Sequence, residues 1–368
     1  MVLQSLSVRL GAGASRDLAQ ACRERYPRRV TLALWVAAEA AIAAMDLAEV
    51  IGTAIALQLL FGLPLAAGVV LTAADVLLLL AVAGRNARAL EALIVVLLML
   101  ICACFVFTLA KAAPPPLAVL RGFVPRRRIF SDPAELYIAT GILGATVMPH
   151  NLYLHSALVQ SRSFSKDAPG RREAIAYATV DSTLALCLAG CINAAILCVA
   201  ADAFAGRSAE VATLHDAAAL LAPALGSAAA TKVFAVGLLA AGQQSTLTGT
   251  LAGQVVMEGF LGPGVSLKPW ARRLVTRLVA IVPAVIVAAI GGAGATSRLL
   301  NLSQVVLSLQ LPFAVFPLVQ FTSQRAVVGE FATGKVLRAV AWTIFAAVTA
   351  INVKLVVDWA SGTGTTVG

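Results

Sequence analysis

The chain has 368 residues, of which 60% are hydrophobic and only 12% are charged, and its mean hydropathy is +0.90. These values exclude an ordinary soluble domain and predict a polytopic membrane protein. The net charge of +10 does not require a nucleic acid as partner, because basic loops that face anionic lipid account for it.

Nine segments are apolar and long enough to cross the hydrocarbon core of a bilayer. In chain order they cover residues 32–60, 64–83, 89–110, 136–160, 174–201, 230–257, 274–292, 299–321 and 337–357. The leading segment Met1–Arg29 is basic and shows no cleavable signal peptide, so we expect the chain to insert through its own spans. The sequence therefore predicts an all-α membrane fold with about nine full transmembrane helices.

The distribution of lysine and arginine predicts the orientation of these spans. When the spans are threaded alternately from a cytoplasmic Met1–Arg29, most basic residues fall on the cytoplasmic side. The loop with Lys111, Arg121 and Arg126–Arg128 is the exception. We expect a multi-pass protein of the inner (cytoplasmic) membrane, with residues 1–29 in the cytoplasm and the lipid bilayer as its surroundings.

Three carboxylates lie in the first predicted span, where each ionised group costs about 3 kcal/mol at the centre of a bilayer. At roughly 100° per residue, Glu39, Asp46 and Glu49 share one sector of the helix and face the same surroundings. Two interpretations stay open: a row of buried ion pairs with Arg272, Arg273 or Arg277, or a route for protons.

The fourth predicted span contains an interruption at Gly141–Asn151 (GILGATVMPHN). A helix broken at mid-depth is tolerated in lipid where its freed backbone groups line a cavity, which in transporters is the substrate site. The thioether of Met148 together with backbone carbonyls favours a transition-metal cation over calcium or magnesium. His150 and His155 follow directly, and such histidines either relay protons or simply make hydrogen bonds.

Motifs of catalysis are absent from the sequence. It contains no glycine-rich phosphate loop, no Gly-x-Ser-x-Gly and no His-Glu-x-x-His, so we expect neither an enzyme nor a bound cofactor. The six cysteines form no Cys-x-x-Cys pair and are expected to be packing residues.

Three segments closely resemble the NRAMP family, in particular bacterial manganese transporters: Met45–Pro64 (MDLAEVIGTAIALQLLFGLP), Gly144–Ser156 (GATVMPHNLYLHS) and Leu300–Ala314 (LNLSQVVLSLQLPFA). The resemblance runs from Met1 to about Asp358, and its Met-Pro-His break is highly specific. It implies a LeuT-type fold of two inverted repeats that imports divalent metal ions, Mn²⁺ or Fe²⁺, with protons as the coupling ion.

The resemblance also implies roles for individual residues. Met148 matches the thioether ligand of the metal, Ala145 a carbonyl ligand, and Gln304 a side chain that approaches the metal, although Gln310 is nearby in the same motif. The residues that match the polar proton pathway are His150, His155, Asp46, Glu49 and Glu39, with Arg272, Arg273 or Arg277 as cationic partners. No obligate protein partner is implied.

One departure from the family concerns its first helix, whose Asp-Pro-Gly-Asn motif supplies a carboxylate and an amide to the metal. That motif does not occur here, and Met1–Leu10 resembles the end of the family's second helix. We therefore expect an N-terminally truncated chain that lacks the first helix and most of the second, and whose transport is impaired. The alternatives are a non-transporting membrane remnant, a partner subunit, or an amino-acid transporter of the same fold.

Within a single transmembrane domain over residues 1–368, the expected organisation has three parts. Residues 1–135 are the remainder of the first repeat, residues 136–321 are the second repeat with its broken helix, and residues 337–357 are an accessory helix.

Overall fold

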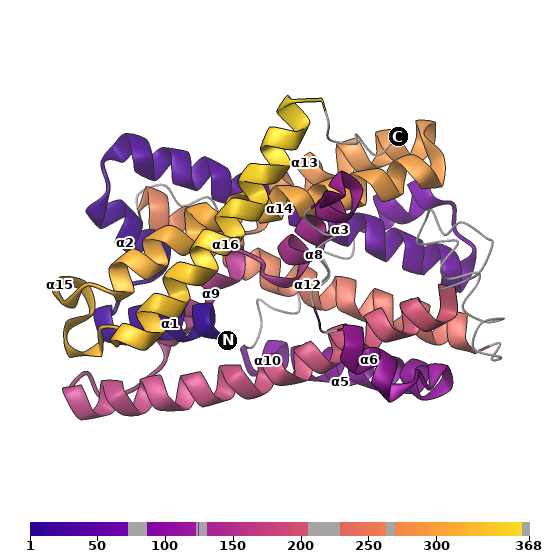
Figure 1. Cartoon of the computed structure of the whole chain (residues 1–368). Coiled ribbons are helices and arrows are strands. Elements are labelled where there is room, and N and C mark those ends of the chain that lie inside the picture. The colour runs from indigo at the N-terminus through magenta and orange to yellow at the C-terminus, as the bar shows by residue number, and fades with distance from the viewer. Residues whose placement is uncertain (73–86, 123, 125–130, 205–228, 263–268, 363–368) are drawn as a thin grey trace.

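The computed structural model describes residues 1–72, 87–122, 124, 131–204, 229–262 and 269–362, and within them the chain is a bundle of helices without strands (Figure 1). The helices are α1 (Val2–Ala14), α2 (Leu18–Arg25), α3 (Arg28–Phe61), α5 (Ala87–Ala112), α6 (Pro116–Gly122), α8 (Pro133–Thr146), α9 (His150–Ser161), α10 (Ala168–Phe204), α12 (Ala230–Leu261), α13 (Pro269–Ile290), α14 (Gly292–Thr322), α15 (Arg325–Val328), the 3-10 turn η1 (Gly329–Phe331) and α16 (Lys335–Ala360).

Most of the predicted spans correspond to these helices. The segment 136–160 is the pair α8 and α9, and the other predicted segments match α3, α5, α10, α12, α13, α14 and α16, with ends that differ by a few residues. Of the predicted span 64–83, residues 65–72 are helical and residues 73–83 lie outside the described part of the chain. The prediction of an all-α membrane fold is confirmed for the residues described.

The helices divide into a central and a peripheral set. In α3 and α14, 67% and 61% of the most apolar 18-residue window is buried. In α5, α10 and α16 the buried share of the corresponding window is only 22%, 11% and 22%. Those five described helices are long and apolar enough to cross a membrane. The burial places α3 and α14 at the centre, with α12 packed against α3, and leaves α5, α10 and α16 with exposed apolar side chains.

The first helix belongs to the core of the bundle. Leu6 and Leu10 of α1 are fully buried, and a Cβ atom added to Gly11 would lie 2.4 Å from the carbonyl oxygen of Ser156 on α9. The backbones of α1 and α9 therefore touch directly, which only glycine allows here. The distribution of charges predicts one basic leading segment over residues 1–29. The structure differs, because residues 2–14 are an apolar helix within the bundle.

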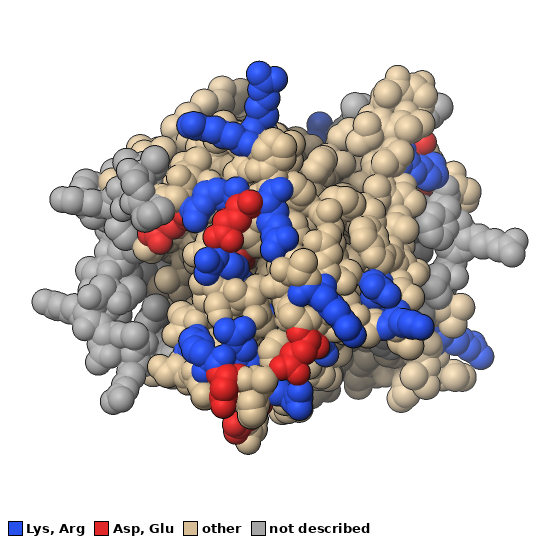
Figure 2. All heavy atoms as spheres, turned by 90° about the vertical axis from the view of Figure 1, so that its left-hand side faces the viewer, with Lys and Arg blue, Asp and Glu red and all other residues tan. Residues whose placement is uncertain are grey.

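The basic segments that were predicted to share one side of the membrane meet at one end of the bundle. Arg25 donates to the carbonyl of Ala326, Arg171 donates to the carbonyl of Gly13 over 2.7 Å, and Arg172 forms an ion pair with Glu330 at 2.9 Å. Figure 2 shows this end, where lysine and arginine side chains are spread among fewer acidic ones.

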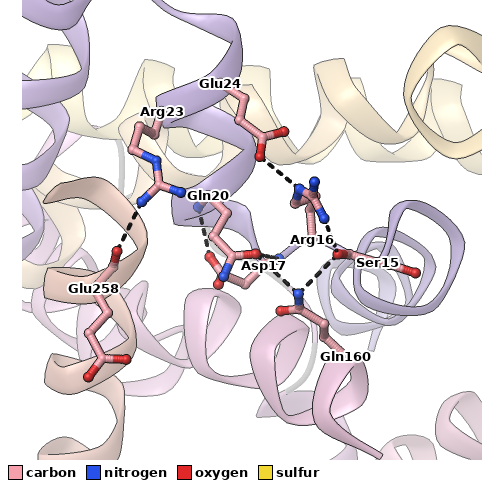
Figure 3. A network of polar contacts seen from close by, with 8 residues as sticks. All are labelled: Ser15, Arg16, Asp17, Gln20, Arg23, Glu24, Gln160 and Glu258. Atoms are coloured by element: carbon pink, nitrogen blue, oxygen red, sulfur yellow. Dashed lines mark hydrogen bonds and ion pairs between the residues drawn. The ribbon is translucent and has the colours of Figure 1, made fainter. Parts of the chain in front are cut away.

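At the same end, α2 is held by a network of polar contacts (Figure 3). The side chain of Gln160 on α9 donates to the carbonyl of Ser15 and to Oε1 of Gln20, and the N–H of Leu18 donates to Oγ of Ser156 over 3.0 Å. Arg23 reaches the last turn of α12. As a result α2 links α1, α9 and α12.

Asp17 caps the first turn of α2 and is buried beneath this network. Its carboxylate accepts the N–H of Gln20 over 2.8 Å, while the side chain of Gln20 accepts the N–H of Asp17. This reciprocal pair is a capping box, which satisfies two donors of the helix terminus. Burial raises the pKa of Asp17 to about 6, although the hydrogen bond from Gln20 acts in the opposite direction.

Candidate functional site

The predicted helix break lies at residues 147–149. The helix α8 ends with the N–H of Val147 bonded to the carbonyl of Leu143 over 2.8 Å, and α9 begins after Pro149. Since proline has no N–H, the carbonyl of Ala145, four residues before Pro149, cannot complete its helical hydrogen bond. The break predicted within Gly141–Asn151 is thus confirmed, but it is shorter than that segment, and both of its glycines lie inside α8.

The two glycines serve the contact between α8 and α14. A Cβ atom on Gly144 would lie 2.0 Å from the carbonyl oxygen of Gln304 and 2.7 Å from the backbone nitrogen of Ser308. On Gly141 it would meet the side chains of Gln304 and Val305 at ordinary distances. The backbone of α14 therefore lies directly against the last turn of α8, and only glycine at position 144 permits this approach.

This contact brings the predicted metal ligands into one region. Ala145 follows Gly144 directly, Met148 is half-buried in the break, and the backbone of Gln304 touches Gly144. The Nε2 atom of Gln304 donates to Oγ of Ser303 over 3.0 Å, so its amide oxygen is the end that can bind a cation. Gln310, the other glutamine of this motif, is buried about two turns further along α14 and is therefore not at the contact with Gly144.

The two histidines after the break have different surroundings. His150 is 2% exposed, and its Nδ1 atom has no hydrogen-bond partner among the described residues. His155 is half-buried and its Nδ1 contacts Oε1 of Gln4 on α1. Such a buried ring nitrogen without a partner is uncommon in folded proteins, which supports a functional interpretation for His150 more than for His155.

The three carboxylates of α3, which are predicted to share one sector of the helix, are buried to different extents. Asp46 is fully buried and Glu49 is 6% exposed. Glu39 is half-buried and accepts a hydrogen bond from Nε1 of Trp35 over 3.2 Å. The candidate partners Arg272, Arg273 and Arg277 are on α13, whose backbone packs against α3, but their side chains lie outside the described part of the structure.

Sequence reasoning missed the direct partners of Glu49. Both of its carboxylate oxygens accept hydrogen bonds from α12, from Oγ of Ser245 over 2.6 Å and from Oγ1 of Thr246 over 3.0 Å. The signal that could have found them is the polar run Gly242–Thr250 (GQQSTLTGT) in the middle of a long apolar helix.

Among the described residues there is no group of three or more histidine, cysteine or acidic side chains that could hold a metal ion. The groups that the break and its neighbour offer to a cation are the thioether of Met148, the carbonyl of Ala145 and the amide of Gln304. Such a donor set is partly soft and carries no net charge.

Comparisons with known proteins agree with these features. A family model described as natural resistance-associated macrophage protein-like (Nramp) matches residues 1–358. The chain belongs to the NRAMP family. Two NRAMP relatives named divalent metal cation transporter MntH, from Bradyrhizobium diazoefficiens and Xanthomonas campestris pv. campestris, are each 54% identical to it. Their alignments cover 97% and 98% of this chain and 79% and 81% of the relatives' own lengths.

Solved structures of the NRAMP family show the same fold. The manganese transporter of Eremococcus coleocola, in complex with an aromatic bis-isothiourea substituted compound, superposes with a TM-score of 0.86 at 36% sequence identity. The match covers 98% of this chain and 77% of the transporter. The predicted LeuT-type fold is therefore confirmed, while the boundaries of its repeats and the assigned roles of individual residues stay predictions.

Proposed function

We propose that this chain transports divalent transition-metal ions, Mn²⁺ and Fe²⁺, across the cytoplasmic membrane, and that protons move with them. The observation that carries the proposal is the break between α8 and α9. There Pro149 frees the carbonyl of Ala145, Met148 contributes a thioether, and Gln304 lies against the preceding turn. The names of the two MntH relatives and of the manganese transporter support the same class of substrate.

The choice of metal follows from the donor atoms. A thioether is a soft ligand that favours transition metals, whereas calcium and magnesium prefer hard oxygen ligands and bind sulfur poorly. Met148 would therefore select the transported ion, while the carbonyl of Ala145 and the amide oxygen of Gln304 would bind most divalent cations.

The proton part of the proposal rests on groups beside the break and on α3. His150 has a buried ring nitrogen without a described partner, and Asp46 and Glu49 are buried acidic side chains at the centre of the bundle. Ionisable groups at such depth are costly and usually mark ion or proton pathways.

The test is manganese uptake into vesicles that contain the purified chain, with calcium as the competing ion. Met148→Ala is expected to keep manganese uptake but to raise competition by calcium on the order of tenfold, because hard oxygen ligands remain. Met99→Ala is the matched control, since Met99 lies on α5 with 61% of its surface exposed. No uptake by the unaltered chain would refute the proposed transport, and unchanged discrimination in Met148→Ala would refute selection by sulfur.

A further inference from the structure

The polar run of α12 packs directly against the acidic part of α3. A Cβ atom added to Gly242 would lie 2.3 Å from Oγ1 of Thr53, so the two helices are in close contact one turn from Glu49. Thr246 is 1% exposed and Glu49 is 6% exposed. The interaction between them therefore takes place away from bulk solvent, where hydrogen bonds to a charged group are strong.

The arrangement of the two hydroxyl groups fits an ionised carboxylate. Ser245 donates to Oε1 of Glu49 over 2.6 Å and Thr246 donates to Oε2 over 3.0 Å, so each oxygen of the carboxylate accepts a hydrogen bond. An ionised carboxylate is an acceptor only, whereas a neutral carboxyl group carries a hydrogen on one of the two oxygens. Protonation of Glu49 must therefore change at least one of these two bonds.

Neighbouring threonines show where a displaced hydroxyl can go. The hydroxyl of Thr248 donates to the backbone carbonyl of Ser245 over 3.0 Å, and that of Thr250 donates to the carbonyl of Thr246 over 2.8 Å. Such bonds to the preceding turn are a normal alternative for serine and threonine in helices. The hydroxyls of Ser245 and Thr246 can make the same bonds, so neither is left as a buried donor without an acceptor.

We propose that Ser245 and Thr246 are positioning residues for proton uptake by Glu49. Both hydroxyls hold its ionised carboxylate, and the one that faces the protonated oxygen rearranges when the proton binds. The proton comes from the aqueous phase and binds one carboxylate oxygen, and no other covalent bond forms or breaks. The hydroxyl that faces this oxygen then accepts from the new O–H or turns to a carbonyl of α12. The inference rests on the proposed proton-coupled transport and adds two residues to it.

Other charged groups near Glu49 also influence its protonation, so a test must leave these groups unchanged. Asp46 lies one turn before Glu49 on α3, and Arg272, Arg273 and Arg277 are on α13, with side chains outside the described residues. Three groups of charged or titratable residues with described side chains lie on the other helices packed against α3. They are Lys232 and Glu258 on α12 with Arg298 on α14, then His150, Tyr153 and His155 on α9, and Cys22, Arg23, Glu24 and Arg25 on α2. Substitutions of Ser245 and Thr246 by uncharged residues alter none of them.

The decisive measurement is an infrared pH titration of the purified chain, in which the carboxyl band that disappears in Glu49→Gln reports the protonation of Glu49. Ser245→Ala and Thr246→Val are each expected to move the midpoint of this band to higher pH by about one unit, because a donor to the charged form is lost. Ser245→Thr and Thr246→Ser keep the hydroxyl and are expected to leave the midpoint in place.

Thr248→Val and Thr250→Val are the matched controls on the same helix, since the hydroxyls that they remove bond only to backbone carbonyls in the contacts described. Equal midpoints in Ser245→Ala, Thr246→Val and the unaltered chain would overturn the inference. A shift of the same size in the two controls would overturn it as well, because the effect would then be a general one on α12.

Manganese uptake at different external pH separates this inference from the proposed function. In the two hydroxyl variants the pH profile of uptake is expected to move in the same direction as the infrared midpoint. If the unaltered chain shows no uptake, or uptake without pH dependence, the proposed proton-coupled transport fails. The infrared titration still decides whether Ser245 and Thr246 control the protonation of Glu49.

Discussion

Gly144→Ala tests whether direct contact between the backbones of α8 and α14 positions the helix break. The added Cβ atom would lie 2.0 Å from the carbonyl oxygen of Gln304 and 2.7 Å from the nitrogen of Ser308. Both neighbours are backbone atoms, which cannot turn aside as a side chain can. The two helices would have to separate locally by at least about 1 Å to restore ordinary contact distances.

The expected cost follows from two opposing effects. Overpacking of a well-packed interior costs about 1–3 kcal/mol, and alanine in place of glycine within a helix returns up to about 1 kcal/mol. We therefore expect Gly144→Ala to lower the stability of the chain by up to about 2 kcal/mol. We also expect it to reduce manganese uptake, because Ala145 and Gln304 adjoin the contact.

The assays are thermal unfolding in detergent micelles and manganese uptake into vesicles. Gly190→Ala is the control, since Gly190 lies within α10, is exposed, and has no atom within 4 Å of an added Cβ. This variant is expected to be as stable as the unaltered chain or slightly more stable. If Gly144→Ala behaves like Gly190→Ala in both assays, close packing at Gly144 does not position the break.

Two further predictions concern pH. Asp46→Asn and His150→Gln are each expected to flatten the pH dependence of manganese uptake. Manganese affinity, measured by calorimetry, is expected to change by no more than about twofold. An unaltered pH profile in both variants would assign Asp46 and His150 structural roles only. The pKa of Asp17 is raised by burial to about 6, above the value of about 3.9 in an unfolded chain, so the folded state loses stability as the pH rises between these values. Asp17→Asn keeps an acceptor for the N–H of Gln20, and in thermal unfolding it should match the unaltered chain near pH 4 but exceed it by up to roughly 3 kcal/mol above pH 7. A constant difference between the two proteins from pH 4 to pH 8 would contradict this reasoning.

The sequence predicted the parts of the structure that lipid itself demands. Hydrocarbon requires a minimum helix length and satisfied backbone groups, so apolar runs such as 337–357 and the interruption before Pro149 could be recognised without a structure. The helix α1 was harder to place, because its 13 residues are fewer than a span needs. It is buried by its neighbours, through contacts that length and hydropathy do not encode.

The candidate site was predicted less completely for a related reason. The order of residues placed Met148, Ala145 and the histidines at the break, since these are close in sequence. The hydroxyls of Ser245 and Thr246 reach Glu49 from almost 200 positions further along the chain. Their contact depends on how α3 and α12 are rotated and aligned, which follows from the packing of the whole bundle.

The two halves of the broken helix are fastened to different neighbours. Gly144 joins α8 to α14, whereas α9 is joined to α1 at Gly11 and to α2 through Ser156. The two halves thus have different backbone contacts, and residues 147–149 are the covalent joint between them. Any rotation of one half against the other must change the dihedral angles of this joint, and with them the distance between the thioether of Met148 and the carbonyl of Ala145. A conformational change could therefore assemble or disperse the ligands of a cation without unwinding either helix.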